Sequence, residues 1–153
     1  QGPARGWGVA LATAGFPPRC GLRRWRVRLD SVNRRCHVFL GVATRRAALG
    51  SYLGADRHGW GYLVSQDLYH GGSRLRSGYG VRMVSGMTVE MTLDTDAGVL
   101  SVGNADTGED FGPALEGRGG HGSGSEGQDT ILYPAFAMHQ PGDSVTFLPA
   151  QGG

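Results

Sequence analysis

Three acidic residues lie close together in the sequence and have the chemistry of a carboxylate-based reaction. Glu90, Asp94 and Asp96 share one parity of a strand-like run, so their side chains would point the same way. At ~3.3 Å per residue Glu90 and Asp94 would lie roughly 13 Å apart, whereas retaining glycosidases hold two carboxyl groups about 5–5.5 Å apart. Asp94 and Asp96 fall in a turn, where aspartate commonly accepts hydrogen bonds from backbone amides. The spacing disfavours a glycosidase and leaves a carbohydrate-binding sandwich as a minor alternative.

The histidines and cysteines show no spacing that is typical of a metal site or a nucleophilic centre. The five histidines are dispersed: His37, His58, His70, His121 and His139. None lies at metal-ligand spacing from another, and no cysteine cluster joins them. Cys20 and Cys36 lack a CxxC partner, which predicts free thiols in a reducing, intracellular and cytoplasmic setting. We therefore expect no enzymatic activity, no metal and no cofactor.

The fifteen basic residues are all arginine, although the formal net charge is only +2. A run of arginines can meet an acidic partner or a nucleic-acid backbone. Aromatic residues are not interleaved with the main cluster, which disfavours nucleic acid. We interpret that cluster as a solvated outer strand face; its members are Arg23, Arg24, Arg26, Arg28, Arg34 and Arg35.

The 153 residues, 28 of them glycine, are typical of one domain built from short strands and turns. Apolar residues alternate with polar ones over 25–29 and again over 38–42, which predicts two strands joined as an antiparallel hairpin. No run of eighteen apolar residues exists, so no membrane span is predicted. The sequence as a whole indicates an all-β, two-sheet antiparallel β-sandwich, jelly-roll-like with long loops. Further strands are expected near 61–63, 68–69, 88–93, 99–102, 111–115, 131–138 and 145–148.

The chain divides into a lead, one domain and a short tail. Residues 1–21 are interpreted as the lead, in which residues 1–3 resemble the remnant of a protease site from an expression tag. Residues 22–150 form the domain, and 151–153 the tail. Residues 117–129 contain six glycines and no apolar residue, which predicts a flexible loop. The natural protein is expected to be longer than this chain.

Six segments, in this order, resemble the SPRY (B30.2) domain family. They are Trp25-Arg26-Val27, Leu40 to Thr44, Gly59 to Tyr62, Leu68 to Gly72, Leu93 to Ser101, and Leu132 to Ala135. Together they span about residues 22–148. The resemblance is nearest to the SPRY domain of SOCS-box adaptor proteins, which share the third and fourth segments. It implies a β-sandwich that acts as a non-catalytic protein-interaction module.

The resemblance also implies where a partner binds. In the SOCS-box relatives, loops at one end of the sandwich clamp an extended peptide. The corresponding residues of this chain are Tyr69, Tyr52, His139, Gln140, Pro141 and Arg5. The relatives carry tryptophan where Gln140 stands, so the same peptide specificity is not expected.

The chemistry of tyrosine supports two of these positions independently. A tyrosine on a loop offers a large rigid surface and a hydroxyl at low entropic cost, and such residues dominate binding hot spots. The alternative for Tyr69 and Tyr52 is a half-buried packing role, and Trp60 is interpreted as core. Arg74 and Arg76 lie near this end of the sandwich and could meet a carboxylate in the ligand.

The expected partner is therefore a protein or peptide. By resemblance, the parent protein would be the substrate-recruiting part of a ubiquitin ligase, or a scaffold. The alternative is a structural domain that packs against other parts of a large multidomain protein.

Overall fold

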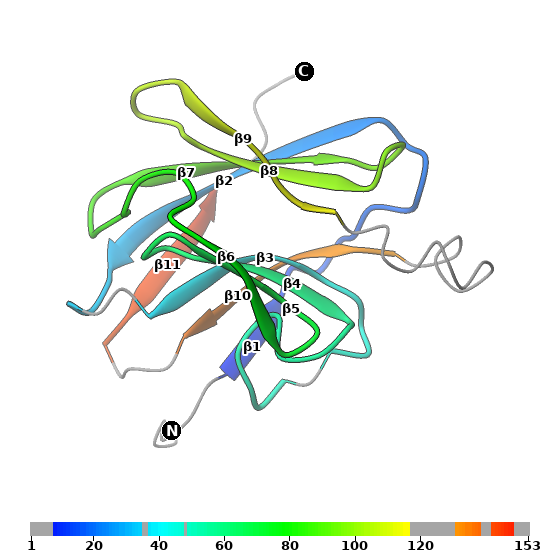
Figure 1. Cartoon of the computed structure of the whole chain (residues 1–153), viewed down its shortest axis with the longest axis horizontal. Helices are drawn as coiled ribbons and strands as arrows, with labels where there is room; N and C mark the ends of the chain where they lie inside the picture. The colour runs from blue at the N-terminus through cyan, green and yellow to red at the C-terminus, as the bar shows by residue number, and fades with distance from the viewer. Residues whose placement is uncertain (1–7, 35–36, 48, 117–130, 139–141, 149–153) are drawn as a thin grey trace.

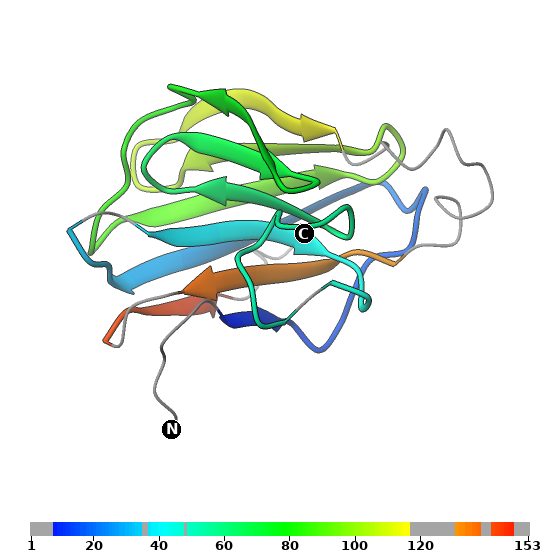
Figure 2. The same ribbon diagram turned by 60° about the horizontal axis from the view of Figure 1, so that its bottom comes forward.

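The computed structural model describes residues 8–34, 37–47, 49–116, 131–138 and 142–148. These residues form eleven strands and no helix, arranged as two antiparallel sheets that face each other (Figures 1 and 2). The predicted two-sheet β-sandwich is confirmed. Within the described residues no helix could span a membrane.

One sheet has six strands in the order β1-β10-β3-β4-β5-β6. Their bounds are β1 Gly8–Leu11, β3 Val38–Ala43, β4 Gly59–Leu63, β5 Asp67–His70, β6 Ser73–Ser77 and β10 Tyr133–Met138. The other sheet has five strands in the order β11-β2-β7-β8-β9. Their bounds are β2 Leu22–Ser31, β7 Thr88–Asp94, β8 Val99–Asn104, β9 Glu109–Glu116 and β11 Ser144–Leu148.

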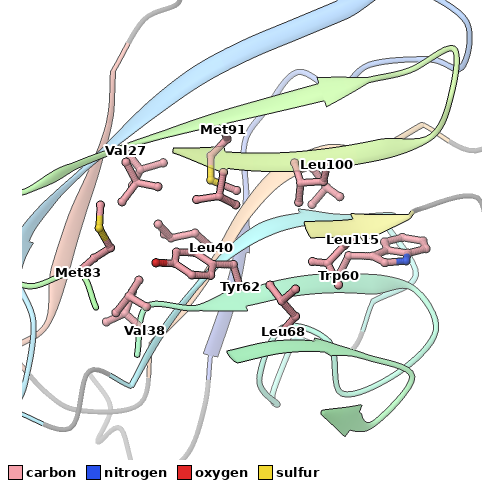
Figure 3. Packing of buried hydrophobic residues seen from close by; sticks show 14 of the residues in the cluster. Val27, Val38, Leu40, Trp60, Tyr62, Leu68, Met83, Met91, Leu100 and Leu115 are labelled. Carbon is pink, nitrogen blue, oxygen red and sulfur yellow. The ribbon is translucent and has the colours of Figure 1, made fainter. Parts of the chain in front are cut away.

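The main hydrophobic core lies between the two sheets. On β2 the alternation seen in the sequence is realised, because Trp25, Val27 and Leu29 are buried while the arginines between them are not. Leu40 and Tyr62 approach this layer from the six-stranded sheet (Figure 3). Side chains with period 2 on both sheets therefore close one continuous core.

A second apolar cluster lies on the outer face of the six-stranded sheet. Strand β3 is buried at all six positions, so it packs on both sides. Leu40 and Val42 face the main core, whereas Phe39 and Ala43 belong to the second cluster. This cluster also contains Leu53, which comes from the loop between β3 and β4.

The predicted hairpin of 25–29 with 38–42 is wrong. Strand β2 pairs with β7 and β11, whereas β3 pairs with β4 and β10 in the other sheet. Both runs carry an apolar face that must be covered, and the fold buries the two faces against each other across the core. If the two runs were paired side by side, their apolar faces would lie on the same side of one sheet, and a further element would be needed to bury them.

Two strands were not predicted. The first, β1, falls inside the segment interpreted as a lead, and it pairs with β10 from Gly8↔Met138 to Leu11↔Ala135. Phe16 of the same segment exchanges backbone hydrogen bonds with Leu132 at 2.8 and 3.0 Å. The second, β6, pairs with β5 and has every residue exposed. The predicted flexible loop 117–129 lies outside the described residues.

Candidate functional site

Three aromatic rings meet on the outer face of the six-stranded sheet. Phe39 of β3 is stacked on Tyr52 with ring centroids 5.4 Å apart. Tyr69 of β5 meets both rings edge-on, 5.2 Å from Phe39 and 5.6 Å from Tyr52. We call these three residues the outer aromatic cluster. Phe39 is buried, while the two tyrosines are half-buried and so keep part of each ring at the surface.

The loop between β3 and β4, residues 44–58, carries Tyr52 and is tied down at several points. The Thr44 amide donates to the carbonyl of His58 at 2.8 Å, which closes the base of the loop. Two further bonds join the loop to the β5–β6 turn: the Gly71 amide donates to Asp56 and the Gly72 amide to Gly54, at 3.0 and 2.9 Å. The loop therefore holds Tyr52 in a fixed position beside β5.

Glycines in the sheet make room for this loop. A Cβ at Gly61 would overlap the carbonyl oxygen of Leu53, and one at Gly54 would lie 2.7 Å from the carbonyl oxygen of Tyr69. Because Gly61 faces outward while Trp60 faces the core, the missing Cβ admits the loop on the opposite side of the sheet.

Burial also affects the electrostatics of Tyr69. Desolvation raises the pKa of its phenol, the nearby carboxylate of Asp67 adds to the rise, and Arg74 opposes it. Tyr69 is therefore a neutral hydroxyl at physiological pH. A neutral phenol beside a guanidinium can offer a ligand both an apolar ring and polar contacts.

The two arginines expected near the ligand are on different faces. Arg74 pairs with Tyr69 across β5 and β6, so its side chain shares the outer face with the aromatic cluster. Arg76 pairs with the core residue Leu68 beyond a bulge, and its guanidinium lies 5.4 Å from the centroid of the Tyr79 ring. The structure thus brings Arg74 to Tyr69 and Tyr52 and separates Arg76 from them.

Trp60 is a core residue, as predicted. It is 6% exposed, and the His70 imidazole is stacked on its indole with centroids 4.6 Å apart and planes 8° from parallel. The His70 Nδ1 lies 2.8 Å from the carbonyl oxygen of Gly59, which fixes the imidazole over the indole. This pair leaves Tyr69 as the outward-facing aromatic residue of β5.

Two arginines of β2 have carboxylate partners on the outer face of the five-stranded sheet. Arg26 lies 3.7 Å from the Glu90 carboxylate, and Arg28 lies 2.7 Å from Asp30. These contacts fit the interpretation of this run as a solvated strand face. Arg35 of the same cluster lies outside the described residues.

The carboxylates of Glu90 and Asp94 have structural partners, and Asp96 lies in the turn that Asp94 closes. Asp94 Oδ1 accepts hydrogen bonds from the amides of Asp96 and Ala97, both at 3.0 Å, and so closes the β7–β8 turn. Glu90 forms the ion pair with Arg26. In the part of the chain that the structure describes, no three His, Cys, Asp or Glu residues gather as a metal site would require.

Comparison with solved structures decides which kind of sandwich this is. The crystal structure of the SPRY domain of human HERC1 matches with a TM-score of 0.75 and 22% identity, over 97% of this chain and 86% of that one. This chain has the SPRY fold. Another human SPRY domain matches with a TM-score of 0.70 at 16% identity, over 95% of this chain and 86% of that one. The crystal structure of the TRIM65 PSpry domain matches with a TM-score of 0.65 and 18% identity, over 93% of this chain and 71% of that one. No family model and no curated protein matches the sequence.

Within this SPRY fold, the segments on which the resemblance rested fall on β2, β3, β4, β5, the β7–β8 turn and β10. Tyr69 and Tyr52 lie together, as the resemblance implied for residues of one site. Arg5, His139, Gln140 and Pro141 lie outside the described residues. Phe39 was missed, because the alternation of Val38, Leu40 and Val42 assigned it to the polar side of its strand.

Proposed function

We propose that this domain is a non-catalytic module that binds a short segment of a partner protein. The observation that carries the proposal is the outer aromatic cluster, in which a loop with several backbone hydrogen bonds holds the half-buried Tyr52 against the half-buried Tyr69 of β5. Rings that are already ordered lose little conformational entropy when a ligand packs on them.

The contacts of the outer aromatic cluster give each tyrosine two roles. One side of the Tyr69 ring packs on Phe39 and Tyr52, which is a structural role. The exposed remainder offers a partner an apolar surface with a hydroxyl at its rim. The charge on Arg74 adds a polar contact beside it, which favours a peptide over a purely apolar ligand.

The named matches motivate a finer form of the proposal. HERC1 and TRIM65 are the proteins whose SPRY and PSpry domains share this fold. By that likeness and the SOCS-box resemblance, we propose that the domain recruits a protein into a larger assembly, as a ubiquitin-ligase adaptor or a scaffold would. This part of the proposal rests on fold analogy alone.

Exposed apolar residues do not favour the alternative of a packing domain. A domain that only packs on its neighbours would present a broad apolar patch. The large exposed apolar side chains among the described residues are spread over five segments: Leu22 on β2, Leu49 in the β3–β4 loop, Leu75 on β6, Val81 and Val84 between β6 and β7, and Ile131 before β10. Single exposed apolar side chains are ordinary on soluble proteins.

The proposal is tested by replacing Tyr69. Peptides would be selected on the wild-type domain from a displayed random library, and their dissociation constants measured by fluorescence anisotropy. Tyr69→Ala should raise the dissociation constant about 5- to 150-fold, equivalent to about 1–3 kcal/mol, because it removes a ring of the outer aromatic cluster. Tyr69→Phe, which keeps the ring, should raise the dissociation constant much less.

Leu22→Ala serves as the control, because it truncates a side chain of 56% exposure on the other sheet. Thermal unfolding would be followed for every variant. An unchanged dissociation constant for a folded Tyr69→Ala protein would show that the partner binds elsewhere. A variant that does not fold would instead make Tyr69 a purely structural residue.

A further inference from the structure

Strand β6 is an open edge of the six-stranded sheet, beside the outer aromatic cluster. It follows β5 as the last strand of its sheet, and all five of its residues are exposed (Figure 1). In the part of the chain that the structure describes, no strand pairs with the backbone N–H and C=O groups of β6 that point away from β5. Such an edge is a template for an incoming strand.

The edge is held rigidly in place. Gly71 and Gly72 form a two-residue turn with φ of 65° and 82°, the left-handed values that a type I′ hairpin requires. The amides of both glycines donate to the loop that carries Tyr52, at 3.0 and 2.9 Å. A strand added to β6 would therefore meet a preorganised partner, which reduces the entropic cost of pairing.

The charge on this edge differs from that in the middle of β2. On β2, Arg26 and Arg28 have carboxylate partners within 4 Å. Neither of the ion pairs recorded among the described residues includes Arg74 or Arg76. Asp67 shares the outer face with Arg74, but it pairs with Ser77 at the other end of β6. The Arg74 end of the edge is thus basic and the Ser77 end is not.

We infer that β6 binds an extended, acidic segment of the partner protein as an added strand, with a carboxylate of that segment on Arg74. The inference rests on the proposed function in that the added strand would run beside Tyr69. The two arginines and the bulge oppose pairing with a neutral or basic strand, including β6 of a second copy. The same features select an acidic segment, and Leu75, 58% exposed, adds apolar contact.

The experiment uses peptides selected from the displayed random library on the wild-type domain. Selected sequences should be enriched in aspartate or glutamate. Arg74→Glu should raise their dissociation constants about tenfold or more, because it replaces an attraction by a repulsion. Arg24→Glu is the matched control: it changes the net charge equally, on an exposed position of β2 in the other sheet. It should have a much smaller effect.

Backbone pairing has its own readout. Peptides N-methylated at alternate residues lose the donors that pair with β6, so one of the two alternating methylation patterns should abolish binding. Binding should also slow hydrogen exchange at the β6 amides that point away from β5. Equal effects of Arg74→Glu and Arg24→Glu, or full binding by both methylated peptides, would overturn the inference.

The outcomes separate the inference from the proposed function. If Tyr69→Ala weakens binding while β6 shows no protection and Arg74→Glu has no effect, the proposed site stands without the added strand. If Arg74→Glu abolishes binding and Tyr69→Ala does not, the edge is the site and the outer aromatic cluster is not. If no peptide is selected on the wild-type domain, both are overturned.

Discussion

Gly61→Ala should lower the free energy of unfolding by about 1–3 kcal/mol, the usual consequence of forcing a methyl group into a packed site. In a domain of this size the thermal midpoint falls roughly 2–4 °C for each kcal/mol. The peptide affinity of the domain should fall with it, because the added methyl group displaces the loop that carries Tyr52.

The reason lies in the close approach of the loop to the sheet. The new Cβ would overlap the carbonyl oxygen of Leu53 and lie 2.9 Å from the Cδ2 atom of Phe39. A backbone oxygen cannot move without its loop, so residues near Leu53 must lift from β4. Tyr52 immediately precedes Leu53 and stacks on Phe39, so this shift opens the outer aromatic cluster.

Gly50→Ala is the matched control. Gly50 lies in the same loop, has no left-handed φ, and has no heavy atom within 4 Å of the position of an added Cβ. Thermal unfolding and peptide titration of both variants check the prediction. A Gly61→Ala protein with the midpoint and affinity of Gly50→Ala would contradict the packing of this loop on β4.

The period-2 alternation in the sequence predicted which strands exist but not how they are arranged. It placed β7 and β8 and the turn between them correctly, because neighbours joined by a tight turn pair with each other. It failed for β2 and β3, because alternation identifies the apolar face of a strand but not the strand beside it. The neighbour of a strand depends on which arrangement of all the strands buries their apolar faces, and this is a property of the whole chain.

The missed elements share a physical cause. Strand β6 is exposed throughout, so its sequence has no apolar face to detect. Strand β1 has only four residues. Phe39 was assigned to a polar side of its strand. Because β3 is buried on both faces, both faces carry apolar residues and the alternation no longer distinguishes them. The association of Tyr52 with Tyr69 came from the SPRY resemblance, since no local pattern joins residues on a loop and on a strand.

The second large effect on stability is expected at Tyr79, whose hydroxyl bridges backbone groups of β8 and β9 that do not pair with each other. Val102 falls where the register of these strands shifts, and its amide donates to the Tyr79 hydroxyl at 3.1 Å instead of to β9. The hydroxyl in turn donates to the carbonyl of Gly112 on β9. Tyr79→Phe leaves the buried Val102 amide without this acceptor, which should cost about 1–3 kcal/mol.

Tyr79→Phe removes the hydroxyl but keeps the packing of the ring. The ring meets Tyr62 edge-on at 5.9 Å and Phe111 at 6.0 Å, contacts that phenylalanine retains. Chemical denaturation of Tyr79→Phe should therefore show lower stability with an unchanged dependence on denaturant concentration. Wild-type stability in this variant would mean that water, or a local shift of β9, satisfies the Val102 amide.

The same residue should make stability fall in alkaline solution. Burial raises the pKa of Tyr79 to about 12, with Asp110 adding to the rise and the hydrogen bond with Val102 and the charge on Arg76 opposing it. In the unfolded chain a tyrosine ionises near pH 10. Between about pH 10 and 12 the unfolded chain has lost a proton that the folded chain keeps, so unfolding releases it and stability falls as pH rises. Below pH 10 both states hold the proton and this contribution is constant.

Tyr79→Phe should be less stable than wild type near neutral pH, yet lose less stability between pH 10 and 12. Denaturation curves of both proteins across this range would test the difference, and equal alkaline losses would contradict it.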